Sequence, residues 1–390
     1  MNTNVESAPI TASSKMQDPS PYPHWMLKEI HEQPQVLQAT LEQYIDTGGF
    51  RAAVCAPLRQ WLREAHREVV IAASGSSRHA GMAGEIMIED RTSIAVDVEY
   101  ASEYCYRRES ATKQAAVLVI SQSGETADTL AALRKAHRAG HQTLAITNVH
   151  NSTMAREATV SFPTAAGRER AIPATKSFTA QLMNLYLLSL LAAEAARTLS
   201  SAELKTLLSD LAGLPALVSA QLQGWESTVR SIAAQIHDVK NLLFLGRGIH
   251  YPIAREGALK LKESAYLHAE GYPSGELKHG PNALVSPNTP LVMLATVDHA
   301  DAESAQRYQK TLQLMRDMRQ QGALIVTVAN TGDTEVSAIA NHTIFVTPAS
   351  EALLSICEVI PLQILSYCMA IQNGIDVDHP RNLTKAVLTE

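Results

Sequence analysis

A repeated order of short apolar runs, small-residue loops and helical segments constrains this chain more than any other feature. The apolar runs are residues 69–73, 117–120 and 143–147 in the first half, and 242–245, 291–295 and 324–328 in the second. Runs of this kind separated by helices are typical of βαβ units and of a parallel sheet. Ile71 and Val119 are separated by the same number of residues as Leu245 and Met293. We therefore predict an α/β fold in which one domain occurs twice, each copy a parallel sheet flanked by helices.

Length and helical pattern set the expected domain boundaries. At about 100–200 residues per domain, 390 residues favour two domains. A helical pattern begins at Trp25 and should break near Pro34, because proline interrupts a helix. The expected order is a flexible tail (1–20), a helical segment (21–44), a first domain (45–200), a helical connection (201–224), a second domain (225–375) and a C-terminal tail (376–390).

Composition excludes several classes of protein. The chain has 33 Lys and Arg against 39 Asp and Glu, so a basic face for nucleic acid is not indicated. Its four cysteines show no CxxC spacing, which argues against a zinc site or a disulfide framework and fits a reducing compartment. Residues 1–20 lack the apolar core of a signal peptide, and polar residues interrupt the apolar stretch 178–196. We expect that stretch to be a buried helix, and the protein to be cytoplasmic with no membrane or nucleic-acid partner.

The loop 121–126, Ser-Gln-Ser-Gly-Glu-Thr, lies between a predicted strand and a predicted helix. In an open parallel sheet, ligands bind beyond the carboxyl ends of the strands, and a helix N-terminus there suits a phosphate. Ser121, Ser123 and Thr126 add hydroxyl donors, and Gly124 allows the backbone to approach a ligand closely.

A simpler alternative is that Ser123 only caps the helix. Glu125 and Asp128 complement the helix dipole, but they would repel a phosphate unless they point away. The chain has no GxxxxGK[ST] motif, and residues 246–248 (Gly-Arg-Gly) lack the third glycine of a dinucleotide loop.

A second polar pattern lies on the predicted helix after residue 252. At 100° per residue, Glu256, Lys260 and Glu263 share one face, and an apolar stripe lies opposite. One interpretation is a solvated face with i,i+4 ion pairs. The other is a carboxylate base beside a cation that holds an anionic substrate or intermediate.

Two further residues could carry chemistry. His279 lies among glycines and a proline, and histidine can move protons near neutral pH, although the chain has 14 histidines. Lys385 lies in a C-terminal segment that is apolar enough to dock, and amines form Schiff bases with keto sugars. A tail of this kind is otherwise usually frayed.

Several longer motifs together resemble one family. They are residues 24–30, 121–130, 174–179, 244–281 and 380–385 (Pro-Arg-Asn-Leu-Thr-Lys). In this order they resemble the isomerase portion of the glutamine–fructose-6-phosphate aminotransferase family, which consists of two sugar-isomerase (SIS) domains.

The resemblance implies a set of site residues and a phosphosugar substrate. The residues expected to bind the substrate are Ser121, Gln122, Ser123 and Thr126 at the phosphate, and Ser76 and Ser77 at the sugar. The resemblance also implies four catalytic residues. Glu263 would move a proton between C1 and C2 of the sugar, and Lys260 would lie beside these carbons. His279 would open the sugar ring from the neighbouring subunit, and Lys385 would form a Schiff base with the sugar. The resemblance also implies a homodimer with shared sites. Neither a metal nor an organic cofactor is expected, since acid–base groups suffice for this chemistry.

The sequence departs from the family pattern in two places. The sequence from Met1 leads straight to the segment at 21–44, and we find no counterpart of the family's glutaminase domain. At residues 172–174, Ile-Pro-Ala replaces a segment that usually offers a serine at position 174. We therefore expect a glucosamine-6-phosphate deaminase that yields fructose 6-phosphate and ammonia. The alternatives are an enzyme for another phosphosugar amine, ammonia-dependent synthesis of glucosamine 6-phosphate, and a phosphosugar sensor without catalysis.

Overall fold

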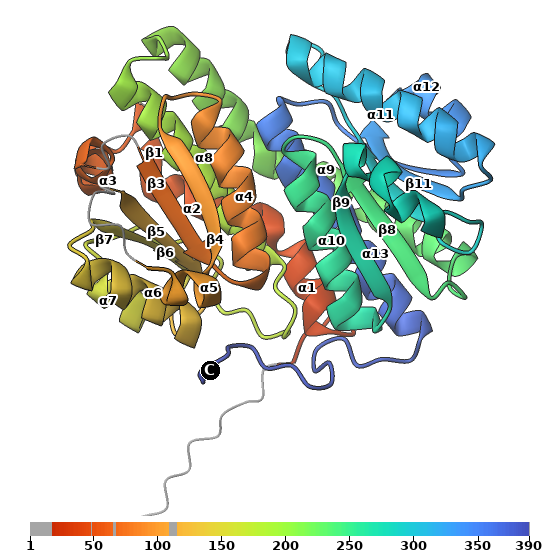
Figure 1. Ribbon diagram of the computed structural model, residues 1–390, viewed down its shortest axis with the longest axis horizontal. Helices are drawn as coiled ribbons and strands as arrows, with labels where there is room; N and C mark the ends of the chain where they lie inside the picture. The colour runs from red at the N-terminus through yellow and green to blue at the C-terminus, as the bar shows by residue number, and fades with distance from the viewer. Residues whose placement is uncertain (1–17, 48, 65–67, 109–114, 390) are drawn as a thin grey trace, which may run out of the picture.

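The computed structural model describes residues 18–47, 49–64, 68–108 and 115–389. Two α/β domains lie side by side, each around a five-stranded sheet in which every neighbouring pair of strands is parallel (Figure 1). The strand orders are β4-β3-β5-β6-β7 and β12-β11-β10-β8-β9. Counted within each domain, both orders are 2-1-3-4-5. The predicted fold class, two copies of one parallel α/β domain, is confirmed.

The strands of the two sheets follow the predicted apolar runs closely at their centres. The first sheet contains β3 (Glu68–Ala73), β4 (Ala95–Tyr100), β5 (Ala116–Ser121), β6 (Thr143–Thr147) and β7 (Val160–Ser161). The second contains β8 (Asn241–Gly246), β9 (His268–Pro273), β10 (Leu291–Ala295), β11 (Ile325–Asn330) and β12 (His342–Val346). A small antiparallel pair, β1 (Ile45–Asp46) and β2 (Gly49–Phe50), precedes them.

Helices cover both faces of each sheet. The helices of the first domain are α3 (Ala52–Glu64), α4 (Gly75–Glu89), α5 (Ala101–Tyr106), α6 (Ala127–Arg138), α7 (Thr153–Glu157) and α8 (Lys176–Ala196). Those of the second are α10 (His250–Ala265), α11 (Ala302–Gln320), α12 (Thr334–Ile339) and α13 (Glu351–Gln372), with short 3₁₀ turns η1 (Ser274–His279) and η2 (Pro281–Leu284). Alternate residues of β3 pack on opposite faces, Ile71 in the core with α4 and α8, and Ala72 in the core with α6.

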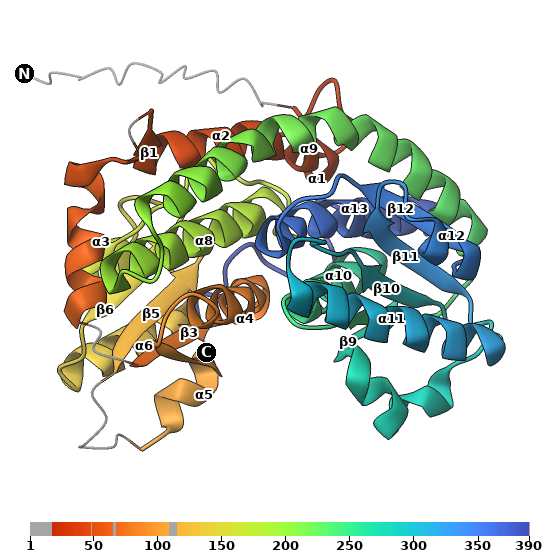
Figure 2. The same cartoon turned by 90° about the horizontal axis from the view of Figure 1, so that it is seen from above.

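One continuous apolar core joins the two domains. It contains Ile71 of β3 and Phe244 of β8, together with side chains of α4, α8, α10 and α13. Two N-terminal helices, α1 (Trp25–His31) and α2 (Gln33–Tyr44), belong to the same core and are separated near Pro34, as predicted. The long helix α9 (Ser201–Gln235) runs across both domains (Figure 2). The expected helical connection at 201–224 lies within α9, which continues to Gln235.

Two apolar helices form the centre of the domains. Residues 178–196, tested from sequence as a membrane span, form most of α8 and are largely buried, as predicted. Helix α13 is long and apolar enough to cross a membrane, but 94% of its most apolar window is buried inside the protein. Burial of this kind is what a core helix shows.

Candidate active site

The first sheet places the start of α4 and the loop 121–126 at a topological switch point. Strands β3 and β5 are neighbours, but β3 leads into α4 on one face and β5 leads toward α6 on the other. Ligands of open α/β sheets bind in the crevice at such a point, beyond the carboxyl ends of the strands. The first turn of α4, with Ser76 and Ser77, and the loop 121–126 both lie at this edge, which we call the crevice.

The loop 121–126 gathers its hydroxyl groups around one turn. Ser121 Oγ lies 2.9 Å from Thr126 Oγ1 and accepts a hydrogen bond from Gly124 N at 3.1 Å. Gly124 has φ +66°, and a Cβ there would lie 2.1 Å from Ser152 Oγ. Only glycine fits this position, because a side chain would collide and the left-handed backbone disfavours it.

The start of α6 does not match the alternative in which Ser123 only caps the helix. Thr126 rather than Ser123 precedes the first helical residue, and its side chain makes no capping hydrogen bond. Ser123 Oγ instead accepts from the backbone N–H of Glu125 at 3.1 Å. The Glu125 carboxylate accepts from Thr153 N at 2.7 Å, so it is directed to α7. The interpretation of Ser123 as the helix cap was wrong, and Glu125 points away from the helix start.

Helix α10 of the second domain brings a buried ammonium to the same crevice. Lys260 Nζ lies 3.1 Å from Ser76 Oγ, 2.5 Å from Glu263 Oε2 and 3.4 Å from Glu256 Oε1. The Lys260 side chain is 1% exposed. Burial opposes its charge, but the carboxylates of Glu263 and Glu256 outweigh burial and hold the pKa of Lys260 above its usual value.

The polar stripe of α10 continues into the first domain through His79. His79 Nδ1 lies 2.8 Å from Glu256 Oε2, and Glu256 is fully buried. Burial alone would raise the pKa of Glu256, but Lys260 and His79 lower it below its usual value. Burial lowers the pKa of His79, so its imidazole is neutral at pH 7. The interpretation as a solvated face was wrong, because Glu256 and Lys260 pack against α4 instead of facing water.

The C-terminal segment spans the two domains. In the second domain, Tyr266 Oη accepts from Arg381 N at 2.6 Å. In the first, the carbonyl oxygen of Val387 accepts from Ala127 N, in the first turn of α6, at 3.0 Å. Lys385 lies between these anchors, so the segment crosses the crevice beside the loop 121–126.

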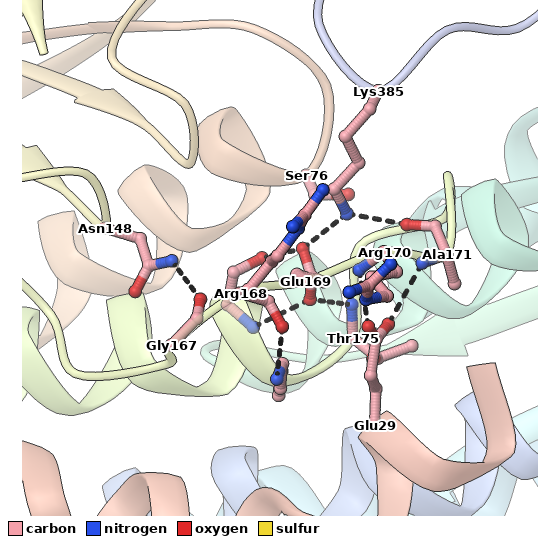
Figure 3. Close-up of polar contacts among 12 residues, drawn as sticks. Glu29, Ser76, Asn148, Gly167, Arg168, Glu169, Arg170, Ala171, Thr175 and Lys385 are labelled. Atoms are coloured by element: carbon pink, nitrogen blue, oxygen red, sulfur yellow. Dashed lines mark hydrogen bonds and ion pairs between the residues drawn. The ribbon is translucent and has the colours of Figure 1, made fainter. Parts of the chain in front are cut away.

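The amine of Lys385 contacts the carboxylate of Glu169, which is not among the site residues expected from the sequence. Its Nζ lies 2.6 Å from Glu169 Oε2 and 2.7 Å from the carbonyl oxygen of Ala171 (Figure 3). Burial would raise the pKa of Glu169, but the Lys385 ammonium and donors from Ser177 outweigh burial and lower it. Glu169 stands between two arginines in sequence, a pattern that suggests exposure, and only the folded chain shows that it is buried.

Helix α1 contributes a second carboxylate below the same segment. Glu29 accepts from the backbone N–H groups of Arg170 at 2.5 Å and Ala171 at 3.3 Å. Burial and the nearby charge of Glu169 raise the pKa of Glu29 to about 8. The chain from 169 to 171 is therefore held from α1 and from the C-terminal segment.

Not all of the expected residues meet in the crevice. Ser77 Oγ accepts from Gln181 Nε2 at 3.1 Å inside the first domain, and Gln122 accepts from Asn148 N through its backbone carbonyl. His279 is exposed on η1, and within the described residues no hydrogen bond or ion pair joins it to the crevice. No group of three potential metal ligands occurs in the described ranges. One chain thus brings together Ser76, Lys260, Glu263, Lys385 and the loop 121–126, but not His279.

Comparison with known proteins gives consistent matches over nearly the whole chain. The family model described as "SIS domain" matches residues 62–191 and 235–372. The chain is 41% identical over 371 residues to glutamine–fructose-6-phosphate aminotransferase (isomerizing) of Chlorobaculum tepidum, covering 95% of this chain and 59% of the relative. The same enzyme of Pseudomonas putida is 42% identical over 374 residues, with 96% and 60% covered. The chain therefore spans about three fifths of the length of these curated relatives.

Solved structures agree with the sequence matches. The C-terminal domain of glucosamine-fructose-6-phosphate aminotransferase from Francisella tularensis matches with a TM-score of 0.86 and 34% identity, over 93% of this chain and all of that one. Glucosamine-6-phosphate deaminase from Thermotoga maritima matches with a TM-score of 0.70 and 23% identity, over 93% and 99%, which shows a shared fold. The chain belongs to the SIS-domain family, with two SIS domains in tandem similar to the isomerase portion of the glutamine–fructose-6-phosphate aminotransferases.

Proposed function

We propose that this protein is a sugar-phosphate isomerase that converts glucosamine 6-phosphate and water to fructose 6-phosphate and ammonia. The observation that carries the proposal is the ion pair between the buried Lys260 and the partly exposed Glu263, which lies at Ser76 in the crevice crossed by the Lys385 segment. The crevice therefore holds a base, a fixed cation and a primary amine. These groups suffice to move a proton between sugar carbons and to exchange nitrogen at one of them.

Phosphate binding is assigned to the loop 121–126. Its hydroxyl groups and the start of α6 offer donors and the positive end of a helix dipole, and both favour an anion. Glu125 supports this assignment because its carboxylate is directed to α7. The six-carbon sugar would then extend from this loop toward Ser76 and α10.

Glu263 is the residue that we assign to proton transfer. In the opened amino sugar it would remove the proton at C2 and return it to C1, which converts the aldose amine to a ketose imine. Lys260 would stabilise the negative charge that develops between these steps, because it is a fixed ammonium in a dry environment.

Lys385 is assigned to nitrogen exchange. Its amine would add to the C2 imine, and ammonia would leave as the new C2–nitrogen double bond forms. Water would then add to C2 and release the amine, giving the ketone of fructose 6-phosphate. Carbon is neither oxidised nor reduced overall, so the reaction consumes only one water.

His279 enters the proposal through a second copy of the chain. It is exposed on η1, and among the residues that the structure describes no hydrogen bond or ion pair joins it to the crevice of its own chain. We propose a homodimer in which His279 of one subunit opens the sugar ring in the other.

A second candidate substrate is another phosphosugar amine. Position 174 is alanine, so its side chain offers no hydroxyl to the sugar, and Ile172 is bound through its backbone to the carbonyl of Asp378. The missing donor favours a sugar whose hydroxyl pattern differs from that of glucosamine.

The test is an ammonia-release assay on the purified 390-residue protein. Glucosamine 6-phosphate, galactosamine 6-phosphate, fructose 6-phosphate with ammonium, and fructose 6-phosphate with glutamine are compared, with Glu263→Gln as the inactive control. We expect ammonia from glucosamine 6-phosphate and no amino sugar from glutamine. Faster release from galactosamine 6-phosphate would favour the second candidate. Binding without turnover of any substrate would indicate a sensor and refute the proposal.

A further inference from the structure

A fully buried carboxylate, Glu169, lies against the amine that the proposed chemistry uses. The side chain of Glu169 is 0% exposed, whereas that of Lys385 is 26% exposed. Figure 3 shows the Lys385 amine between Glu169 and the carbonyl of Ala171, with Ser76 close by. The carboxylate is thus fixed in the interior, and the amine is the partner that can reach a substrate.

We infer that Glu169 is the positioning residue and counter-ion of Lys385. It holds the amine at the crevice as an ammonium and then balances the charge of the iminium that Lys385 forms with the sugar. This inference rests on the proposed function, because it takes Lys385 as the reacting amine.

Donors at the start of α8 fix the position of the Glu169 carboxylate. The backbone N–H groups of Thr175 and Ser177 both donate to Oε1 at 3.0 Å, and Ser177 Oγ donates to Oε2 at 2.7 Å. These three contacts do not involve the C-terminal segment. The carboxylate therefore keeps its place when Lys385 moves from the resting contact toward a substrate carbon.

The charge balance of the reaction suits a carboxylate that stays ionised. When the Lys385 ammonium condenses with the C2 carbonyl of fructose 6-phosphate, nitrogen loses two protons and the sugar oxygen leaves with them as water. Nitrogen keeps one proton, a new double bond to C2 and the positive charge. Glu169 therefore faces a cation before and after the step, and it needs neither to gain nor to lose a proton.

The surroundings of Glu169 favour its ionised form. Lys385 of the C-terminal segment and Lys260 of α10 act on it as cations, and Glu29 of α1 acts as the opposing carboxylate. The pKa of Glu169 is lowered despite complete burial, whereas the pKa of Glu29 is raised. Of these two neighbouring carboxylates, Glu169 is the one that carries the charge at neutral pH.

The experiment traps the iminium on the whole protein. Fructose 6-phosphate and borohydride are added to wild type, Glu169→Gln, Glu169→Asp and Lys385→Ala, and the adduct is located by mass spectrometry of peptides. We expect a Lys385 adduct in wild type, none at this position in Lys385→Ala, and a trapping rate reduced about 100-fold in Glu169→Gln, the scale of losing one preorganised electrostatic contact. Glu169→Asp keeps the charge and should recover part of the rate. Binding of fructose 6-phosphate should change less than about threefold, because phosphate binding is assigned to the loop 121–126, which is separate from Glu169.

A matched variant separates positioning from support of the fold. Glu29→Gln weakens the hold on the backbone at residues 170 and 171 but leaves the contact between Lys385 and Glu169 intact. It should trap within a few-fold of wild type, and circular dichroism checks the folding of every variant. Trapping of Glu169→Gln at the wild-type rate, or an equal loss in Glu29→Gln, would overturn the inference alone. Absence of a Lys385 adduct in wild type would overturn both the inference and the assigned role of Lys385.

Discussion

The Glu263→Gln substitution tests the assigned proton transfer most directly. The amide keeps the size of the side chain and can still accept a hydrogen bond from Lys260, but it cannot remove a proton. General acid–base catalysis contributes about 10²–10⁴-fold, so kcat should fall by at least about 100-fold. KM should change little, because phosphate binding is assigned to the loop 121–126.

The Glu263→Gln substitution should lower stability only modestly, so its effect on activity can be measured separately. Loss of one partner from a fully buried ion pair costs about 3–5 kcal/mol. Glu263 is 22% exposed and Lys260 keeps Glu256 at 3.4 Å, so we expect about 1–2 kcal/mol here. That loss lowers the melting temperature by a few degrees, and assays at 25 °C remain on folded protein.

Glu256→Gln is the matched control, since it also removes a carboxylate from Lys260. If ionic support of Lys260 were the only role of Glu263, the two variants would lose similar activity. We expect Glu263→Gln to lose far more, and to stop exchange of the substrate's C2 hydrogen with solvent, as followed by NMR in D₂O. A kcat within a few-fold of wild type, or unchanged exchange, would refute the assignment.

Three other predictions concern assembly, pH and the phosphate loop. Mixing Glu263→Ala subunits with His279→Ala subunits should restore some activity, because one site of each hybrid dimer receives both intact residues. If subunits are shown to exchange and no activity returns, His279 acts in the site of its own subunit. Burial raises the pKa of Glu29 to about 8, so the folded state binds a proton that the unfolded state releases above its normal pKa. As the pH rises from about 5 to 8, the free energy of unfolding of the wild-type protein should therefore fall relative to that of Glu29→Gln. The fall should reach up to about 1.4 kcal/mol per pH unit, as measured by urea titrations. Gly124→Ala should raise KM about tenfold, whereas Gly140→Ala, at φ +79° with open space, should leave KM unchanged.

The central strands could be predicted from sequence because burial on both faces makes them continuous apolar runs. β6 and β10 were predicted at the observed residues, and each is buried throughout. The edge strands β4 and β9 were missed, since polar residues at exposed or half-buried positions, such as Asp97 and Glu270, interrupt their apolar pattern. The signal for a strand thus weakens where a sheet meets solvent.

Part of the candidate site could also be predicted. The loop 121–126 and the stripe of α10 follow from local patterns, and helical periodicity places Lys260 and Glu263 on one face. Periodicity does not show that this face packs against α4. Glu169 could not be predicted, because its burial depends on the start of α8 and on a lysine more than half the chain away.

The shared core has a consequence for the route by which a substrate enters. Moving the domains apart would expose apolar side chains such as Ile71 and Phe244 to water. That exposure costs about 25 cal/mol of free energy per Å² of apolar surface. The segment around Lys385 is held instead by a few polar contacts, and Leu383 and Val387 remain exposed. Lifting this segment is the cheaper motion, so the residence time of the product should depend on residues 381–387 more than on any hinge between the domains.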